Sequence, residues 1–158
     1  MKNIKCFILI VILAALLSAG IVFAQNNTTL EEHDFDSYFK MNVPKGMSFE
    51  KIEGAQSKNI NLTLNYRNDS LKINVVYTQS IGAKNTLVKY YEEMAKNNTD
   101  MKMNSTGNTT IIHFNGKNII GETNYHDMAI VGDNEKYILM QCDNETLMKS
   151  MAESVKFK

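Results

Sequence analysis

The sequence has little cysteine. Of the two cysteines, Cys6 lies within an apolar N-terminal run, so Cys142 stands alone in the rest of the chain and has no partner for an internal disulfide. The fold is therefore expected to hold by packing, with Cys142 as a small buried side chain in a strand. The alternative interpretations of a lone thiol outside the membrane are a reducing or anoxic habitat and an intermolecular bridge.

Clustered positive charge is also lacking. The chain holds 17 basic and 17 acidic residues, and Arg67 is its single arginine. The first 24 residues contain Lys2 and Lys5 and no acidic residue, which leaves the remainder mildly acidic. Binding to nucleic acid phosphates needs clustered Lys and Arg. Nucleic acid is therefore not an expected partner.

Catalytic signatures are missing as well. The sequence contains no Gly-rich phosphate loop, no Cys or His zinc spacing, no G-x-S-x-G elbow and no internal repeat. No catalytic residue, cofactor or metal is predicted from a motif. These absences favour a protein that is not an enzyme, although they do not exclude one.

The clearest feature that is present is the N-terminal segment, residues 1–24. Lys2 and Lys5 precede an uncharged, largely apolar run from residue 6 to residue 23. A charged start followed by such a run is typical of a signal peptide, and the small residue Ala24 predicts cleavage before Gln25. No cysteine follows the run directly, so a lipoprotein signal is not expected.

The alternative to cleavage is a membrane anchor. Eighteen apolar residues are at the lower limit of what crosses a hydrocarbon core of about 30 Å as a helix. The N-terminal lysines favour a cytoplasmic N-terminus. Both interpretations place residue 25 onward outside the cytoplasmic membrane, either secreted or anchored through residues 6–23.

The sequence is also rich in possible glycosylation acceptors. Chance placement of its Asn, Ser and Thr residues predicts roughly 2.4 N-x-[ST] triplets. The chain has eight, at Asn26, Asn27, Asn61, Asn68, Asn97, Asn104, Asn108 and Asn144. A glycoprotein is one interpretation. An Asn-rich composition, combined with the preference of Asn for turns and caps, is the other.

Apolar and polar residues alternate beyond residue 35, which is typical of strands with one buried face. The polar residues 25–34 predict a spacer before a domain that spans residues 35–158. The alternation is clearest over residues 60–67 and 71–78, which the turn Asn68-Asp69-Ser70 separates, and it predicts a β-hairpin. Other strands are expected at 39–43, 47–49, 111–114, 119–125, 128–131 and 137–142.

Two helices are expected. Apolar residues between 87 and 94 follow helical spacing, with Asn85 as the candidate N-cap and an end near residue 97. A second helix should follow Asp143 or Asn144, and residues 155–157 should form a short closing strand. The predicted fold is α+β, an antiparallel sheet of about six to eight strands packed with a central and a C-terminal helix, preceded by an N-terminal hydrophobic helix.

The order of these elements carries a resemblance. The segment 39–49, FKMNVPKGMSF, and the closing segment 151–157, MAESVKF, flank a long hairpin, a helix and a meander. Over residues 35–158 the chain resembles the PsbP-like domains of exported proteins. This resemblance implies an α/β/α sandwich that acts as an accessory or binding module, usually without catalysis, and it brings no fixed catalytic set to these positions.

Few residues suggest chemistry. His33 lies in the acidic run 31–36, which has the oxygen ligands that a divalent cation prefers, but a solvated acidic run is the plainer interpretation. His126-Asp127, with Glu122 and Tyr125 nearby, offers acid-base groups, yet neighbouring residues of a strand point to opposite faces.

Two further candidates involve sulfur. Cys142 with His113 or His126 is formally a nucleophile and base, although nothing in their spacing supports the pairing. Met101 and Met103 suggest a soft copper site, but methionines alternating in a strand more often face a core.

Two classes of function remain. The first is a non-catalytic extracytoplasmic domain that binds an envelope protein, a polymer or a small ligand through one sheet face. Its candidate contacts are Tyr66, Tyr77, Tyr90 and Tyr91, although their spacing also suits core packing. The second is a small extracellular hydrolase or metal-dependent enzyme that uses His113, His126 and neighbouring carboxylates.

Overall fold

The computed structural model describes residues 28–53, 62–114 and 126–158. Several sequence predictions lie outside these residues: the signal or anchor segment 1–24 with cleavage after Ala24, the acceptors Asn26, Asn27 and Asn61, and the strand at 119–125. Within the described part of the chain, neither helix is both long enough and apolar enough to cross a membrane.

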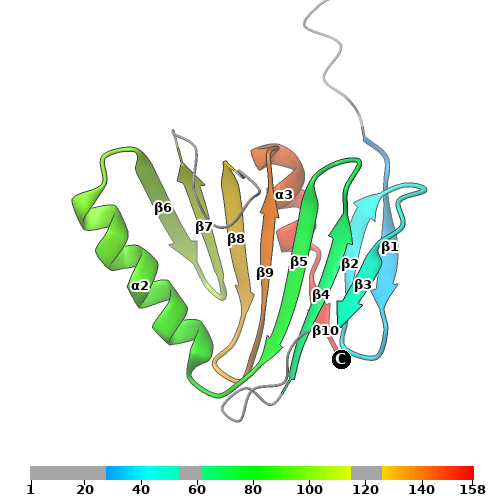
Figure 1. Ribbon diagram of the computed structural model, residues 1–158, viewed down its shortest axis with the longest axis horizontal. Helices are drawn as coiled ribbons and strands as arrows, with labels where there is room; N and C mark the ends of the chain where they lie inside the picture. Colours follow the sequence, from blue (N-terminus) through cyan, green and yellow to red (C-terminus); the bar gives the residue numbers. More distant parts are fainter. Residues whose placement is uncertain (1–27, 54–61, 115–125) are drawn as a thin grey trace, which may run out of the picture.

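The main structure is a seven-stranded sheet in which every neighbouring pair of strands is antiparallel. The strand order is β3-β4-β5-β9-β8-β7-β6 (Figure 1). Its strands are β3 (Glu50–Glu53), β4 (Leu62–Asn68), β5 (Ile73–Gln79), β6 (Met101–Thr106), β7 (Thr109–Phe114), β8 (Asp127–Gly132) and β9 (Lys136–Cys142). The α+β class and an antiparallel sheet of the expected size are confirmed.

The predicted hairpin is confirmed as β4 and β5. Their register pairs Leu64 with Tyr77 and Tyr66 with Val75, so one apolar face forms across both strands. Asn68 closes the turn, because its side-chain oxygen accepts hydrogen bonds from the Ser70 hydroxyl and the Leu71 amide. The turn extends further than expected, since Leu71 is exposed and strand β5 begins only at Ile73.

A second sheet of three strands was not expected. It consists of β1 (Leu30–Phe35), β2 (Phe39–Pro44) and the short β10 (Lys156–Phe157), in the order β1-β2-β10. β1 begins at Leu30, so a strand occupies half of the segment that the sequence predicted as a polar spacer. The expected return strand at 47–49 is shifted too, because β3 begins at Glu50 while Met47 and Phe49 pack against the core.

The central helix α2 spans Ala83–Asn97. Its predicted N-cap, Asn85, is wrong, because the helix begins three residues earlier than that cap requires. Gly82 precedes it with a φ of 81°, a left-handed conformation that glycine adopts readily. The Thr86 amide donates to the Gly82 carbonyl as the first bond of the helix, and the Ala83 amide donates to the Ser80 carbonyl at 3.3 Å, while no side chain caps this end.

The C-terminal helix α3 spans Glu145–Glu153 and confirms the predicted cap. The Asn144 side-chain oxygen accepts a hydrogen bond from the Leu147 amide at 2.9 Å. Met148, Met151 and Ala152 form the buried stripe of this helix. The cap fixes where α3 begins after β9, and it therefore also fixes the backbone position of Glu145.

The two faces of the large sheet have different covers. Helix α2 packs on one face, where Tyr91 joins Ile112, Met128 and Ile130 in an apolar cluster. Helix α3 and the β1-β2-β10 sheet pack on the other face, in a cluster that includes Phe39 and Met140. Figure 1 places α2 beside β6 and the small sheet toward the β3 end.

Candidate functional site

On the face of the large sheet that α3 covers, an apolar row of side chains lies next to a polar row. The two rows are two residues apart along strands β7 and β8. Register places Ile111, Ala129 and Met140 side by side on β7, β8 and β9. Two residues further along, the same face presents His113 and Asp127, and Lys102 lies opposite His113 on β6. Because side chains two residues apart share a face, this polar row lies at the edge of the buried core.

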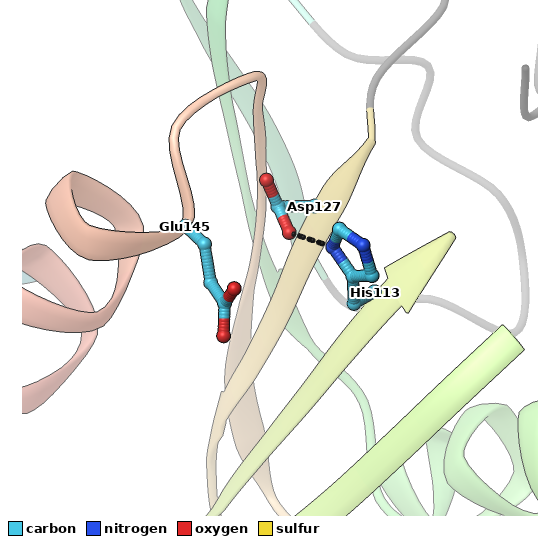
Figure 2. A group of neighbouring side chains, drawn as sticks. All are labelled: His113, Asp127 and Glu145. Carbon is cyan, nitrogen blue, oxygen red and sulfur yellow. Dashed lines mark hydrogen bonds and ion pairs between the residues drawn. The ribbon is translucent and has the colours of Figure 1, made fainter. Parts of the chain in front are cut away.

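His113 and Asp127 form the centre of the row. His113 Nδ1 lies 2.7 Å from Asp127 Oδ1, and Figure 2 shows the imidazole directed at the carboxylate from the next strand. The Asp127 side chain is 4% exposed, while the His113 side chain is 35% exposed. A buried carboxylate is costly unless it is hydrogen-bonded or paired. His113 therefore supplies the partner that Asp127 needs, and it keeps one edge open to solvent.

The third group is Glu145, in the first turn of α3 (Figure 2). It forms an ion pair with Lys149 one turn along the helix. The Lys149 ammonium lowers the pKa of Glu145 first of all by hydrogen bonding, and the charges of His113 and Lys102 act in the same direction. The Glu145 carboxylate is therefore ionised at neutral pH.

These side chains border a cleft of about 360 Å³ between α3, β6 and β7. Its lining combines the two lysines, His113 and Glu145 with Met103, Asn104 and Ile111. A few convergent polar groups beside apolar surface are the usual composition of a small-ligand site. The arrangement can bind a charged ligand, hold a cation between one imidazole and two carboxylates, or support proton transfer at His113.

The acid-base candidates His126 and Asp127 have different partners in the structure. The two residues do not pair with each other, which agrees with the expectation that neighbouring residues of a strand point to opposite faces. The His126 amide instead donates to the Asp143 carboxylate, and its ring nitrogen Nδ1 lies 3.4 Å from the Phe114 carbonyl. The pairing of His113 with Asp127 was missed, because it depends on cross-strand register. Glu122 and Tyr125 lie outside the described residues.

Cys142 is buried in β9, as predicted. It is the strand neighbour of Asp127, so two strand spacings, about 10 Å in all, separate its backbone from that of His113. Burial raises the pKa of its thiol to about 11, and the charges of Asp127 and Asp143 add to this effect. A thiol that stays protonated, with no histidine beside it, is not an activated nucleophile.

The acidic run 31–36 does not form a cation site. Glu32 pairs with Lys40 and Lys156, Asp34 with Lys158, and Asp36 with Lys51. His33 points elsewhere, with its ring 4.6 Å from that of Phe35. These acids instead tie β1 to its neighbours through lysines on several strands. The carboxylates of the run stay about half exposed to solvent, and most of the run lies in strand β1 rather than in a segment without regular structure.

The remaining candidates belong mainly to the core. Met101 is buried and Met103 packs against the same apolar cluster, which confirms their interpretation as core residues. Tyr66, Tyr77 and Tyr91 are also buried. Tyr90 on α2 is 58% exposed and is the one of the four tyrosines that lies open to solvent.

The described acceptor asparagines differ in accessibility. Asn104 and Asn108 are exposed, as is Asn144 at its cap. The Asn97 amide donates to the Glu93 carbonyl at an exposed position. Asn68 is 9% exposed, and its amide donates to the Ser48 carbonyl at 2.7 Å, a hydrogen bond that an attached glycan would disrupt. Glycosylation at these positions stays a prediction.

Comparison with known proteins finds no similar protein. No protein-family model matches the chain, and no curated protein or solved structure is detectably similar to it.

Proposed function

We propose that this protein is an exported, non-catalytic accessory or binding domain of the cell envelope. The signal or anchor segment supports the location outside the cytoplasmic membrane, whether the chain is secreted or stays tethered through residues 6–23. The proposed partner is an envelope protein, a polymer or a small ligand. A PsbP-like α/β/α sandwich is part of this proposal, and helices on opposite faces of the large sheet support it.

The observation that carries the proposal is the cleft beside α3. Lys102, His113, Glu145 and Lys149 converge there from two strands and a helix, next to apolar surface. The tyrosines first considered for ligand contacts are mostly buried, so the binding surface moves from an aromatic sheet face to this cleft. Charged side chains of both signs favour a ligand that is itself charged.

Site-directed photo-crosslinking in the native cell tests the cleft. A photoreactive residue replaces Asn104, which is exposed and lines the cleft, and in a matched control it replaces the exposed Tyr90 on the opposite face. We expect an adduct at position 104 that Lys102→Glu removes, and no adduct at position 90. An adduct at position 90 alone, or one at 104 that is insensitive to Lys102→Glu, contradicts the proposal.

The same preparation tests the location. Intact mass and N-terminal sequencing of the protein from the envelope and medium fractions should give either a chain that begins at Gln25 or an uncleaved chain in the membrane. Mass beyond that of the bare chain would report glycans at the acceptor asparagines. A chain found only in the cytoplasmic fraction would contradict export.

A second candidate is a small extracellular hydrolase or metal-dependent enzyme. The His113–Asp127 pair favours it, because a buried carboxylate that orients an imidazole is a common general-base arrangement. His126 makes its contacts with other residues. The expected difference is that a His113→Ala substitution abolishes turnover in an enzyme, whereas in a binding domain it changes affinity alone.

A further inference from the structure

We propose that His113, Asp127 and Glu145 form a binding site for one divalent transition-metal ion of the zinc type. The inference rests on the proposed function in that it takes the cleft beside α3 as the place where a ligand binds. The three ligand atoms lie within 4.8 Å of one another. They come from β7, β8 and the first turn of α3, three elements that meet at the polar end of the sheet (Figure 2).

The types of ligand identify the ion. One imidazole nitrogen and two carboxylate oxygens suit zinc and its neighbours, whereas calcium and magnesium prefer oxygen ligands alone. Three protein ligands leave a fourth tetrahedral position open. The cleft is the accessible side of the cluster, because Asp127 is buried while His113 and Glu145 line the cleft and have side chains 35% and 44% exposed. An ion therefore has a path into the site.

The geometry needs small adjustments. Two ligands on a tetrahedral zinc ion lie about 3.3 Å apart when each bond is near 2.0–2.1 Å. His113 Nδ1 and Asp127 Oδ1 are 2.7 Å apart, so the pair has to open by about 0.6 Å. The Glu145 side chain is partly exposed, and rotation about its own bonds brings its carboxylate onto the same ion.

Burial of Asp127 adds support to the site beyond its hydrogen bond with His113. A carboxylate on a fully buried strand is a liability that apolar residues of similar size would remove. A cation in place of the shared proton gives this carboxylate a stronger partner, and it leaves the strand pairing of β7 and β8 unchanged.

Lys149 competes with the ion for Glu145. Their contact is a surface pair spaced i,i+4, with both side chains at least 44% exposed, and such pairs are weak. An ion that binds Glu145 therefore displaces Lys149 easily. Removal of the competing charge should strengthen metal binding, an effect that a chance surface site elsewhere on the protein would not show.

Calorimetric titration of the tag-free, full-length protein in detergent micelles with Zn²⁺ tests the inference. We expect one ion per chain, and with Co²⁺ the visible absorption of a tetrahedral ion. Affinity should fall at least about tenfold in Glu145→Gln and about 100-fold in His113→Ala. Lys149→Ala should tighten binding about two- to fivefold. Glu145→Gln is the decisive variant. Because its side chain is partly exposed, this substitution should not unfold the protein, and a loss of Zn²⁺ affinity would then report the loss of a ligand.

Matched controls use the other histidines. His33→Ala and His126→Ala should leave the affinity within about twofold of the parent protein, since neither ring belongs to the cluster. Absence of Zn²⁺ binding, or binding that Glu145→Gln leaves unchanged, overturns the inference. If crosslinking at position 104 persists while Zn²⁺ fails to bind, the cleft keeps its binding role and only the metal site is refuted. Loss of both refutes both proposals.

Discussion

Stability at alkaline pH should depend on Cys142. The thiol is 3% exposed, and burial raises its pKa from an ordinary value of 9.0 to about 11. The unfolded chain therefore loses this proton first as the pH rises. The contribution to stability is fully present below pH 9 and is lost between pH 9 and pH 11.

The size of the effect follows from the two pKa values. At pH 10 about nine tenths of the thiols are ionised in the unfolded state and about one tenth in the folded state. The free energy of unfolding should then be about 1 kcal/mol lower than at neutral pH on account of this residue alone. A typical domain has a total stability of about 5–15 kcal/mol, so the change is readily measured.

Urea unfolding under reducing conditions, at pH 7 and pH 10, measures the effect. Buried tyrosines such as Tyr77 and Tyr91 also have raised pKa values, so the parent protein alone does not isolate the thiol. Cys142→Ala provides the reference, because its loss of packing is the same at both pH values. We expect the cost of this substitution to shrink by about 1 kcal/mol between pH 7 and pH 10. A cost that is equal at both pH values would refute the reasoning.

Two further predictions concern the end of β8 and the start of α3. Gly132→Ala should be severely destabilising, because its new Cβ would collide with the Lys136 carbonyl oxygen. Gly107→Ala has open space and should cost only about 1–2 kcal/mol for its left-handed backbone, so urea unfolding of both variants should show the larger loss at Gly132. Asn144→Ala should lower stability by about 1 kcal/mol by removing the cap of α3, and Asn144→Asp should retain it; equal losses in unglycosylated protein would contradict the capping role.

Much of the main sheet could be predicted from alternation. β4 and β5 each bury one apolar face, so a period of two is visible in their sequences, whereas β9 is covered on both faces and shows a continuous apolar run. β1 gave no such signal. Its residues Glu32 and Asp34 are partly exposed and pair with lysines of β2 and the C-terminal segment, while only Phe35 is buried in the core. A strand with so little apolar surface looks like a loop when its pairing partner is unknown.

Helix ends show a similar limit of sequence-based prediction, as the cap of α3 and the start of α2 illustrate. Asn144 was predictable, because its side chain precedes a strong apolar stripe and makes a local bond. Asn85 was chosen for the same reason, although α2 begins at a left-handed glycine. At α2 no side chain caps the first turn, and the Ala83 amide donates instead to the Ser80 carbonyl, an arrangement set by the backbone before the helix rather than by a capping residue.

The residues of the candidate site come together only through the pairing register of the strands, which cannot be read from their positions along the chain. His126 and Asp127 are neighbours in the chain, yet the partner of Asp127 is His113, fourteen positions away on the adjacent strand. A shift of one residue between β7 and β8 would turn His113 or Asp127 to the α2 face and separate them. The apolar row of Ile111 and Ala129 prevents that shift, because it must stay under α3. The core thus fixes the register, and the register brings together the charged groups at its edge.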